Sequence, residues 1–183
     1  MSPKRWPGSS RAAISASSLC EFRPTSVPAM TPEDLVEIEA IRQLKARYFR
    51  LMDQKRWDEW EDVFCDDVVI STPDDTGEDS DITGNKAFRV YLEPILAPII
   101  TTHHGHMSEI SIDGPDTASA VWSMEDHLDW PPESGVGQMW GTGWYEETYR
   151  KGDDGKWRIA TLRLRRQRIQ VEGNRVFPVE RPS

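Results

Sequence analysis

The sequence lacks several features that would place it directly in a well-known functional class. It has only two cysteines, Cys20 and Cys65, and their wide separation fits neither a metal motif nor a disulfide framework, which is typical of a reducing cytoplasm. No apolar run approaches the roughly 18 residues needed to span a bilayer. The motifs G-x-G-x-x-G, G-x-S-x-G and C-x-x-C and the P-loop are also missing, so nucleotide binding by those routes is not supported.

Basic residues are in short supply relative to acidic ones. The chain has 22 Lys and Arg residues against 31 Asp and Glu residues, which gives a formal net charge of −9. This balance disfavours nucleic acids and anionic membranes as partners. The length of 183 residues and the hydrophobic content of 37% instead predict one globular domain with a real core.

The first 30 residues differ in composition from the rest. They are rich in Ser, Pro, Ala and Arg, and they bury little. We expect residues 1–30 to be a disordered tail or the result of a start codon assigned too early, with a targeting peptide as the less favoured alternative. The sequence then predicts a domain at 31–175 and a C-terminal tail at 176–183.

Hydrophobic periodicity predicts helices in the first half of the domain. Thr31 provides a capping hydroxyl before a helix that should end near Asp53. Two further helices are predicted at 56–64 and 85–99, with an acidic loop at 72–84 between them. The apolar residues of the first helix recur at three- or four-residue steps: Leu35, Ile38, Ile41, Leu44, Tyr48 and Leu51.

After residue 100 the hydrophobic period changes to two, which indicates strands. Segments 108–113 and 117–130 are expected to pair through a turn at Gly114-Pro115, and a second hairpin joins 139–150 to 156–171. In the last strand the apolar face switches near Ala160-Thr161, which indicates a β-bulge or a sheet buried on both sides. Helices followed by a long antiparallel sheet predict an α+β fold with the helices on one face.

Three of the four histidines, His103, His104 and His106, lie within four positions of one predicted strand. Strict alternation puts His104 and His106 on one face and His103 on the other, so a pocket role for His106 requires an irregularity at Gly105. A zinc site would need a third ligand from elsewhere in the chain. The alternatives are structural histidines and a single catalytic acid or base.

Two charged residues on later strands are candidates for a pocket. Asp126 follows Trp122 and Met124 on the predicted buried face of a strand, where a carboxylate needs a partner or a shifted pKa. If the strand ends there, the side chain reaches water instead. Arg166 belongs to the run RLRRQR, which forms either a solvated strand edge or a strand with one arginine directed at an anion.

Tyr48 and Asp53 lie in the first predicted helix, five residues apart. Five helical residues turn the chain by about 140°, so the two side chains share no face in a regular helix. They converge only if the helix ends near Asp53. Each also has an ordinary explanation, as a packing tyrosine and a helix-end acid.

Residues 35–171 resemble the SnoaL-like group of the nuclear transport factor 2-like superfamily. The run IEAIRQLKARYFRLMDQKRWDEWEDVF resembles the first two helices of that group, and the runs HHGHMSEISID, TASAVWSMEDH and GKWRIATLRLRR follow at the usual intervals. Within the group the nearest likeness is to bile acid 7α-dehydratase, and beyond it to scytalone dehydratase and ketosteroid isomerase. The resemblance implies a cone-shaped barrel of three N-terminal helices packed on a curved, mainly antiparallel sheet, and a homodimer or homotrimer.

The resemblance also implies a site. It assigns catalytic roles to Tyr48, Asp53, His103 and Asp126. It also places Arg166 in the pocket, as a substrate contact. From their positions on the predicted strands, His106, Trp122 and Met124 are further expected substrate contacts, and neither a metal nor a cofactor is expected. Two segments that look peculiar to this chain, 74–81 and 130–140, are expected to border the pocket mouth.

The implied function is cofactor-free elimination of water from a steroid-like or polycyclic hydroxy ketone, with His103 as general acid and base. The implied partner is an apolar polycyclic small molecule, with a coenzyme A thioester among the candidates. One alternative is a steroid or polyketide isomerase or cyclase that uses the same pocket. Another is a non-catalytic ligand-binding or assembly subunit, in which the pocket is occluded or the polar groups are dispersed.

Overall fold

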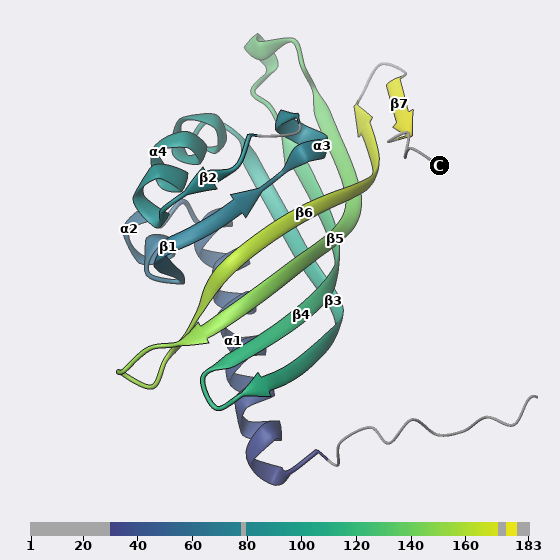
Figure 1. Cartoon of the computed structure of the whole chain (residues 1–183). Helices are drawn as coiled ribbons and strands as arrows, with labels where there is room; N and C mark the ends of the chain where they lie inside the picture. Colours follow the sequence, from purple (N-terminus) through teal and green to yellow (C-terminus); the bar gives the residue numbers. More distant parts are fainter. Residues whose placement is uncertain (1–29, 78–79, 172–174, 179–183) are drawn as a thin grey trace, which may run out of the picture. The chain divides into compact units, whose positions relative to one another are not determined.

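The computed structural model describes residues 30–77, 80–171 and 175–178, and α1 (Pro32–Asp53) is the first element within them (Figure 1). A capping box starts this helix: Asp34 N donates to Thr31 Oγ1 at 3.1 Å, and Thr31 N donates to the Asp34 carboxylate at 2.8 Å. The helix ends at Asp53, as predicted. The tail predicted at 1–30 lies outside the described residues apart from Met30.

The second predicted helix, at 56–64, is shorter than expected. α2 covers only Trp57–Glu61, and Phe64 begins a strand, β1 (Phe64–Ser71), that the sequence pattern does not predict. A pair of exposed aspartates interrupts the strand, so its burial alternates only around Val68 and Ile70. An alternation this short gives little signal for a strand.

The acidic segment predicted as a loop at 72–84 contains two short elements, α3 (Pro73–Thr76) and β2 (Ile82–Thr83). α4 (Asn85–Leu96) corresponds to the third predicted helix and ends earlier than the predicted range of 85–99. None of the helices in the described ranges combines the length and the apolar character that crossing a bilayer requires.

The remaining strands form a curved sheet with the helices packed on one side, so the predicted α+β fold is confirmed (Figure 1). The strand order is β2-β1-β6-β5-β4-β3, with β7 paired to β6. All pairings are antiparallel except that of β1 with β6. The bounds of the later strands are β3 (Ile100–Gly114), β4 (Thr117–Asp129), β5 (Gln138–Lys151), β6 (Trp157–Val171) and β7 (Arg175–Pro178). Because β7 includes residues 176–178, the tail predicted at 176–183 begins inside a strand.

The predicted bulge in the last long strand is confirmed at Ala160. Thr161 pairs with Thr148 and Ile159 pairs with Tyr149, so Ala160 is an extra residue on β6. The extra residue reverses the alternation of inward and outward side chains beyond it. The buried residues of β6 after the bulge are Leu162, Leu164 and Arg166.

One ion pair lies inside the apolar core, between Lys45 of α1 and Glu147 of β5. Their side chains are 1% and 0% exposed. Burial lowers the pKa of the Lys45 ammonium, and the charge of Glu147 opposes this change. Glu147 also accepts a hydrogen bond from Tyr149, whose hydroxyl accepts one from Trp122 Nε1 at 2.8 Å. Lys45 Nζ lies over three aromatic rings, those of Tyr145, Tyr48 and Phe49, at 3.7, 4.2 and 4.7 Å from their centroids.

Candidate active site

A cavity of ≈ 230 Å³ lies between α1, α4 and the inner face of the sheet. Apolar side chains form much of its wall, including Phe88, Leu92, Leu128, Leu162 and Leu164. Polar side chains also line it, among them Tyr48, Asp75, His103, Asp126, Tyr145 and Arg166. A few polar groups in an apolar, concave wall are the usual composition of a small-molecule site.

The imidazole of His103 is held by Asp53 at the end of α1. His103 Nδ1 lies 2.6 Å from Asp53 Oδ1, and the backbone N–H of His103 donates to Asp53 Oδ2 at 3.0 Å. Burial favours the protonated carboxyl, but the hydrogen bonds from His103 and Thr101 outweigh it and lower the pKa of Asp53. Because an ionised carboxylate only accepts, Nδ1 carries the proton and Nε2 is left as the basic nitrogen.

The sequence predicts that Tyr48 and Asp53 can approach the same site only if the helix ends near Asp53. α1 does end at Asp53. Tyr48 lies within the regular helix and lines the cavity, whereas Asp53 is its last residue and reaches the start of β3. Asp53 is therefore behind His103 and does not line the cavity itself. The arrangement places the tyrosine and the histidine on one cavity and the aspartate as the partner of the histidine.

The lowered pKa of Asp53 predicts that this carboxylate stabilises the fold and that its contribution is lost in acid. The contribution is fully present above the usual Asp pKa of about 4 and is lost as the pH falls through the lower folded-state value. We expect the difference in free energy of unfolding between wild type and Asp53→Asn to be largest near pH 7 and to shrink below pH 4, measured by urea unfolding. Asp113→Asn, at an exposed position of β3, is the control. A difference that stays constant with pH would contradict the assignment.

Tyr145 is a cavity residue that sequence reasoning missed. Its hydroxyl is hydrogen-bonded to that of Tyr48, and burial raises the pKa of both phenols. Both therefore stay protonated near neutral pH. Because each phenol has a single proton and Tyr48 donates its proton to Tyr145, Tyr145 is the one that can donate a hydrogen bond to an oxygen in the cavity. The alternation of β5 was the available signal, because it puts Tyr145, Glu147 and Tyr149 on one face.

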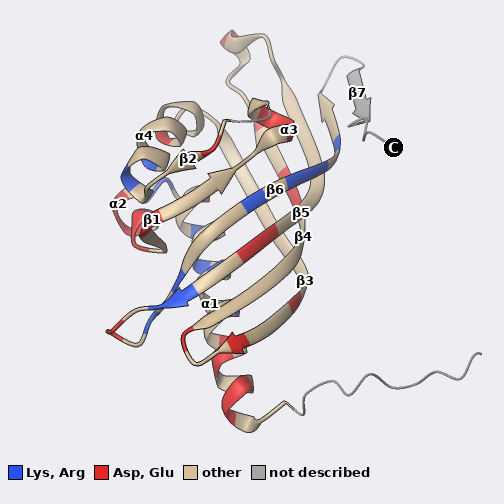
Figure 2. Cartoon of the chain, in the orientation of Figure 1, with Lys and Arg blue, Asp and Glu red and all other residues tan. Residues whose placement is uncertain are grey.

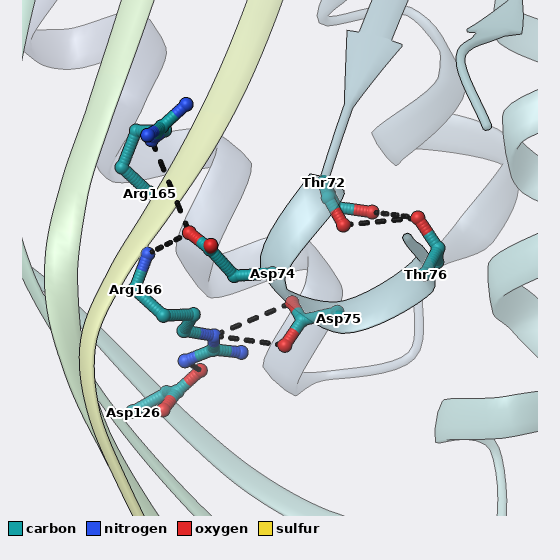
Figure 3. Close-up of polar contacts among 7 residues, drawn as sticks. All are labelled: Thr72, Asp74, Asp75, Thr76, Asp126, Arg165 and Arg166. Carbon is teal, nitrogen blue, oxygen red and sulfur yellow. Dashed lines mark hydrogen bonds and ion pairs between the residues drawn. The ribbon is translucent and has the colours of Figure 1, made fainter. Parts of the chain in front are cut away.

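Arg166 is enclosed by carboxylates (Figure 3). Its Nη1 donates to Asp126 Oδ2 at 2.7 Å, its Nε donates to Asp75 Oδ1 at 3.1 Å, and its backbone N–H donates to Asp74 Oδ2 at 2.7 Å. Burial opposes the charge of the guanidinium, but Asp126 and Asp75 outweigh it and raise the pKa of Arg166. Figure 2 shows the acidic α3 next to the basic part of β6. The charge of Arg166 is thus already compensated within the protein.

Asp126 is 2% exposed, so the explanation of a strand end open to water is wrong. The carboxylate lies inside and pairs with Arg166, which is 6% exposed. The same alternation buries Trp122 and Met124, but neither lines this cavity. Trp122 instead donates to Tyr149 in the core.

Gly141 of β5 makes room for the buried pair Asp126 and Arg166. A Cβ added there would clash with Asp126 Oδ1 and lie 2.5 Å from Arg166 Nη1. We expect Gly141→Ala to lower the free energy of unfolding by about 1–3 kcal/mol, measured in urea, because the overpacked pair must shift. Gly152→Ala is the control, since an added Cβ there meets only the movable ends of Arg158 and Asp154. Equal stability of Gly141→Ala and wild type would show that the pair is not held as described.

His106 does not lie on the cavity. The register of β3 does shift between Gly105 and Ser108, but the shift leaves His106 on the outer face together with His104, with ring centroids 6.0 Å apart. His106 Nε2 lies 3.3 Å from Glu125 Oε2. The predicted substrate contact of His106 is therefore replaced by a contact on the opposite side of the sheet.

Glu125 contacts a second histidine of the outer face, His127, whose Nε2 lies 2.9 Å from Glu125 Oε1. The hydrogen bond with His127 is the largest cause that lowers the pKa of Glu125 to about 2. Within the described ranges, no three His, Cys, Asp or Glu side chains are grouped as metal ligands.

The two segments that looked peculiar to this chain do border the cavity. Thr72, Asp75 and Thr76, at and around α3, contribute to its lining. Trp130 and Met139, on either side of the turn that joins β4 to β5, contribute as well. These segments set part of the size and polarity of the space open to a ligand.

Comparison with known structures identifies several with the same fold. A variant of Rv3472, a protein of unknown function from Mycobacterium tuberculosis, has a TM-score of 0.64 and 28% identity, over 76% of this chain and 78% of that one. A candidate scytalone dehydratase from Novosphingobium aromaticivorans has a TM-score of 0.69 and 23% identity, over 82% and 97% of the two chains. A hexachlorocyclohexane dehydrochlorinase, LinA type 2, has a TM-score of 0.65 and 16% identity, over 79% and 95%.

The sequence itself also matches a family model. The match to the SnoaL-like domain covers residues 33–163, which run from the first turn of α1 into β6. The range includes most of the polar groups of the cavity, and Arg166 lies just beyond it. The chain therefore belongs to the SnoaL-like domain family, within the nuclear transport factor 2-like superfamily.

Proposed function

We propose that this chain is an enzyme that eliminates water from a cyclic hydroxy ketone without a cofactor, with His103 as its general base. The observation that carries the proposal is the pairing of His103 Nδ1 with Asp53 Oδ1 at 2.6 Å, beside a largely apolar cavity that His103 lines. A histidine oriented by a carboxylate is a common acid–base device for proton transfer near neutral pH. The candidate scytalone dehydratase and LinA share the fold, and their names describe eliminations, of water in the first case and of hydrogen chloride in the second.

In the proposed reaction, His103 Nε2 removes a proton from the carbon next to the ketone. The C–H electron pair forms the enolate. Tyr145, which accepts a hydrogen bond from Tyr48, donates one to the enolate oxygen. Asp53 stabilises the imidazolium that results. The enolate then reforms the ketone with a new carbon–carbon double bond and expels the β-hydroxyl. That hydroxyl takes the proton back from His103 and leaves as water.

The charges of the cavity favour an uncharged substrate. Arg166 is paired with Asp75 and Asp126, so a carboxylate or phosphate in the cavity would find no uncompensated cation there. The proposed substrate class therefore excludes coenzyme A thioesters, whose phosphates would need a free cation.

The cavity volume favours a compact substrate. At ≈ 230 Å³ the space is below the range of about 300–1,000 Å³ usual for drug-sized ligands. We accordingly narrow the predicted polycyclic or steroid-like substrate to a molecule of one or two rings.

The two alternatives from the sequence predict different observations. An isomerase or cyclase uses the same base but returns the proton to carbon, so the mass of its product equals that of its substrate. A binding subunit requires an occluded pocket or dispersed polar groups, whereas here Tyr48, Tyr145 and His103 line one cavity. Association into dimers or trimers remains a separate proposal, which light scattering of the purified protein tests.

The proposal is tested by mass spectrometry of wild type incubated with a panel of one- and two-ring β-hydroxy ketones in heavy water. Loss of one water from a substrate is the expected result. Deuterium uptake next to the ketone without loss of water identifies proton abstraction alone and supports the isomerase. If no compound either reacts or takes up deuterium above the rate of His103→Gln, the proposed chemistry is wrong.

A further inference from the structure

Lys55 has an unusual backbone. Within the described ranges it is the one non-glycine residue with positive φ, at 59°. It occupies the position just after the C-cap of α1, where Lys55 N donates to Met52 O at 3.1 Å and Arg56 N donates to Leu51 O at 2.9 Å. This hydrogen-bond pattern is the Schellman motif, in which the left-handed residue is usually Gly and sometimes Asn. A lysine is less favourable than glycine there, so backbone stability alone does not explain it.

The Lys55 side chain is directed at the partner of the catalytic histidine. Lys55 Nζ donates to Thr101 Oγ1 at 2.8 Å, and Thr101 Oγ1 donates to Asp53 Oδ1 at 2.9 Å. An ammonium group only donates and a hydroxyl has a single proton, so both hydrogen bonds run toward the carboxylate. The same Oδ1 atom contacts His103 Nδ1 at 2.6 Å. The four side chains form one continuous chain of hydrogen bonds.

We propose that Lys55 and Thr101 are positioning residues that set the proton affinity of His103 by acting on Asp53. The inference rests on the proposed role of His103 as the base. A cation near Asp53 withdraws part of the electrostatic support that the carboxylate gives to a protonated imidazole. The Thr101 hydroxyl donates a hydrogen bond to the same carboxylate oxygen, which reduces the support that this oxygen gives to a protonated imidazole. Together they keep His103 unprotonated, and able to accept a proton, at lower pH than Asp53 alone would allow.

The surroundings of Lys55 fit a charged group in a partly desolvated position. Burial lowers the pKa of the Lys55 ammonium, and the charge of Asp53 opposes this change. The Lys55 ammonium lies 6.0 Å from the centroid of the Trp57 ring. The other titratable groups on the cavity come from every element around it and are left intact by the test: Tyr48 of α1, Asp75 of α3, Tyr91 of α4, Asp126 of β4, Tyr145 of β5 and Arg166 of β6.

The test is a histidine titration by ¹⁵N NMR of the full chain, which needs no substrate. We expect the midpoint for His103 to rise by about 0.5–1 pH unit in Lys55→Met, because a nearby cation is lost. Thr101→Val should move it in the same direction, and Thr101→Ser should return it toward wild type. The outer-face histidines, His104, His106 and His127, serve as internal references.

Two further variants separate this role from a structural one. Lys55→Gly removes the side chain and suits the left-handed backbone, so we expect unchanged or higher melting temperature together with the same rise in the His103 midpoint. Arg56→Gln removes the neighbouring exposed cation, which pairs with Glu59, and should leave the midpoint unchanged.

A His103 midpoint that is the same in wild type, Lys55→Met and Thr101→Val would overturn the inference. A failed substrate screen would not produce that result, because the titration reads the histidine directly. Once a substrate is found, the acid limb of kcat/KM should shift to higher pH in Lys55→Met, in parallel with the titration.

Discussion

Replacing His103 with glutamine is expected to lower kcat/KM for the proposed elimination by about 10²–10⁴-fold, the usual contribution of a positioned acid–base group. Glutamine is similar in size and can still donate to Asp53, which binds the Nδ1 side of the imidazole. It has no basic nitrogen to take a proton from carbon. The measurement is the steady-state rate of dehydration at pH 7, with folding checked by circular dichroism.

His106→Gln is the matched control for that experiment. The substitution is chemically identical and lies on the same strand, but His106 is on the outer face beside Glu125. We expect kcat/KM to remain within about twofold of wild type, because the side chain cannot reach the cavity. Equal losses in the two variants would mean that the His103 cavity is not where the reaction occurs.

The second large effect concerns stability. Lys45→Met is expected to lower the free energy of unfolding by about 3–5 kcal/mol, because it leaves the carboxyl group of Glu147 buried without its cation. Methionine fills most of the volume of lysine, so lost packing contributes less than the uncompensated charge. Urea unfolding at pH 7, followed by tryptophan fluorescence, measures the change.

Two comparisons give this prediction its specificity. Lys151→Met breaks another lysine–glutamate pair, with Glu37, but those side chains are 19% and 30% exposed, so we expect a loss of no more than about 1 kcal/mol. Adding Glu147→Leu to Lys45→Met removes both buried charges and should recover much of the loss. If Lys45→Met unfolds no more easily than Lys151→Met, the buried pair does not have the role described here.

The parts of the fold that the sequence predicts are those with long, regular periods. The helix through Tyr48 and the alternating strands are examples, and the switch of parity at Ala160 even located a bulge. The sequence pattern did not predict β1 because its inward and outward side chains alternate over only a few residues. Its parallel partner, β6, also lies far along the chain. Local periodicity contains no information about such a distant partner.

The site was predictable only in part. The resemblance supplied Asp53 and His103, which the structure brings together, whereas alternation alone left open which face of β3 was inward. Thr101 and Lys55 were missed, because their contact depends on a helix end meeting a strand 46 positions later in the chain. Helix and strand periods place side chains on faces, but they do not specify which two faces come into contact.

The parallel pairing of β1 with β6 also bears on the order of folding. Phe64 is opposite Ile159, so this pair closes a loop that contains nearly all of the sheet, at a high cost in chain entropy. The hairpins of β3, β4 and β5 form between neighbours in sequence and carry no such cost. Asp75, in α3 just after β1, can meet Arg166 of β6 in the cavity wall only when β1 pairs with β6. The reaction space is therefore completed late, and a nascent chain that has not yet released β6 from the ribosome contains His103 and Asp53 without the enclosed cavity that would make them useful.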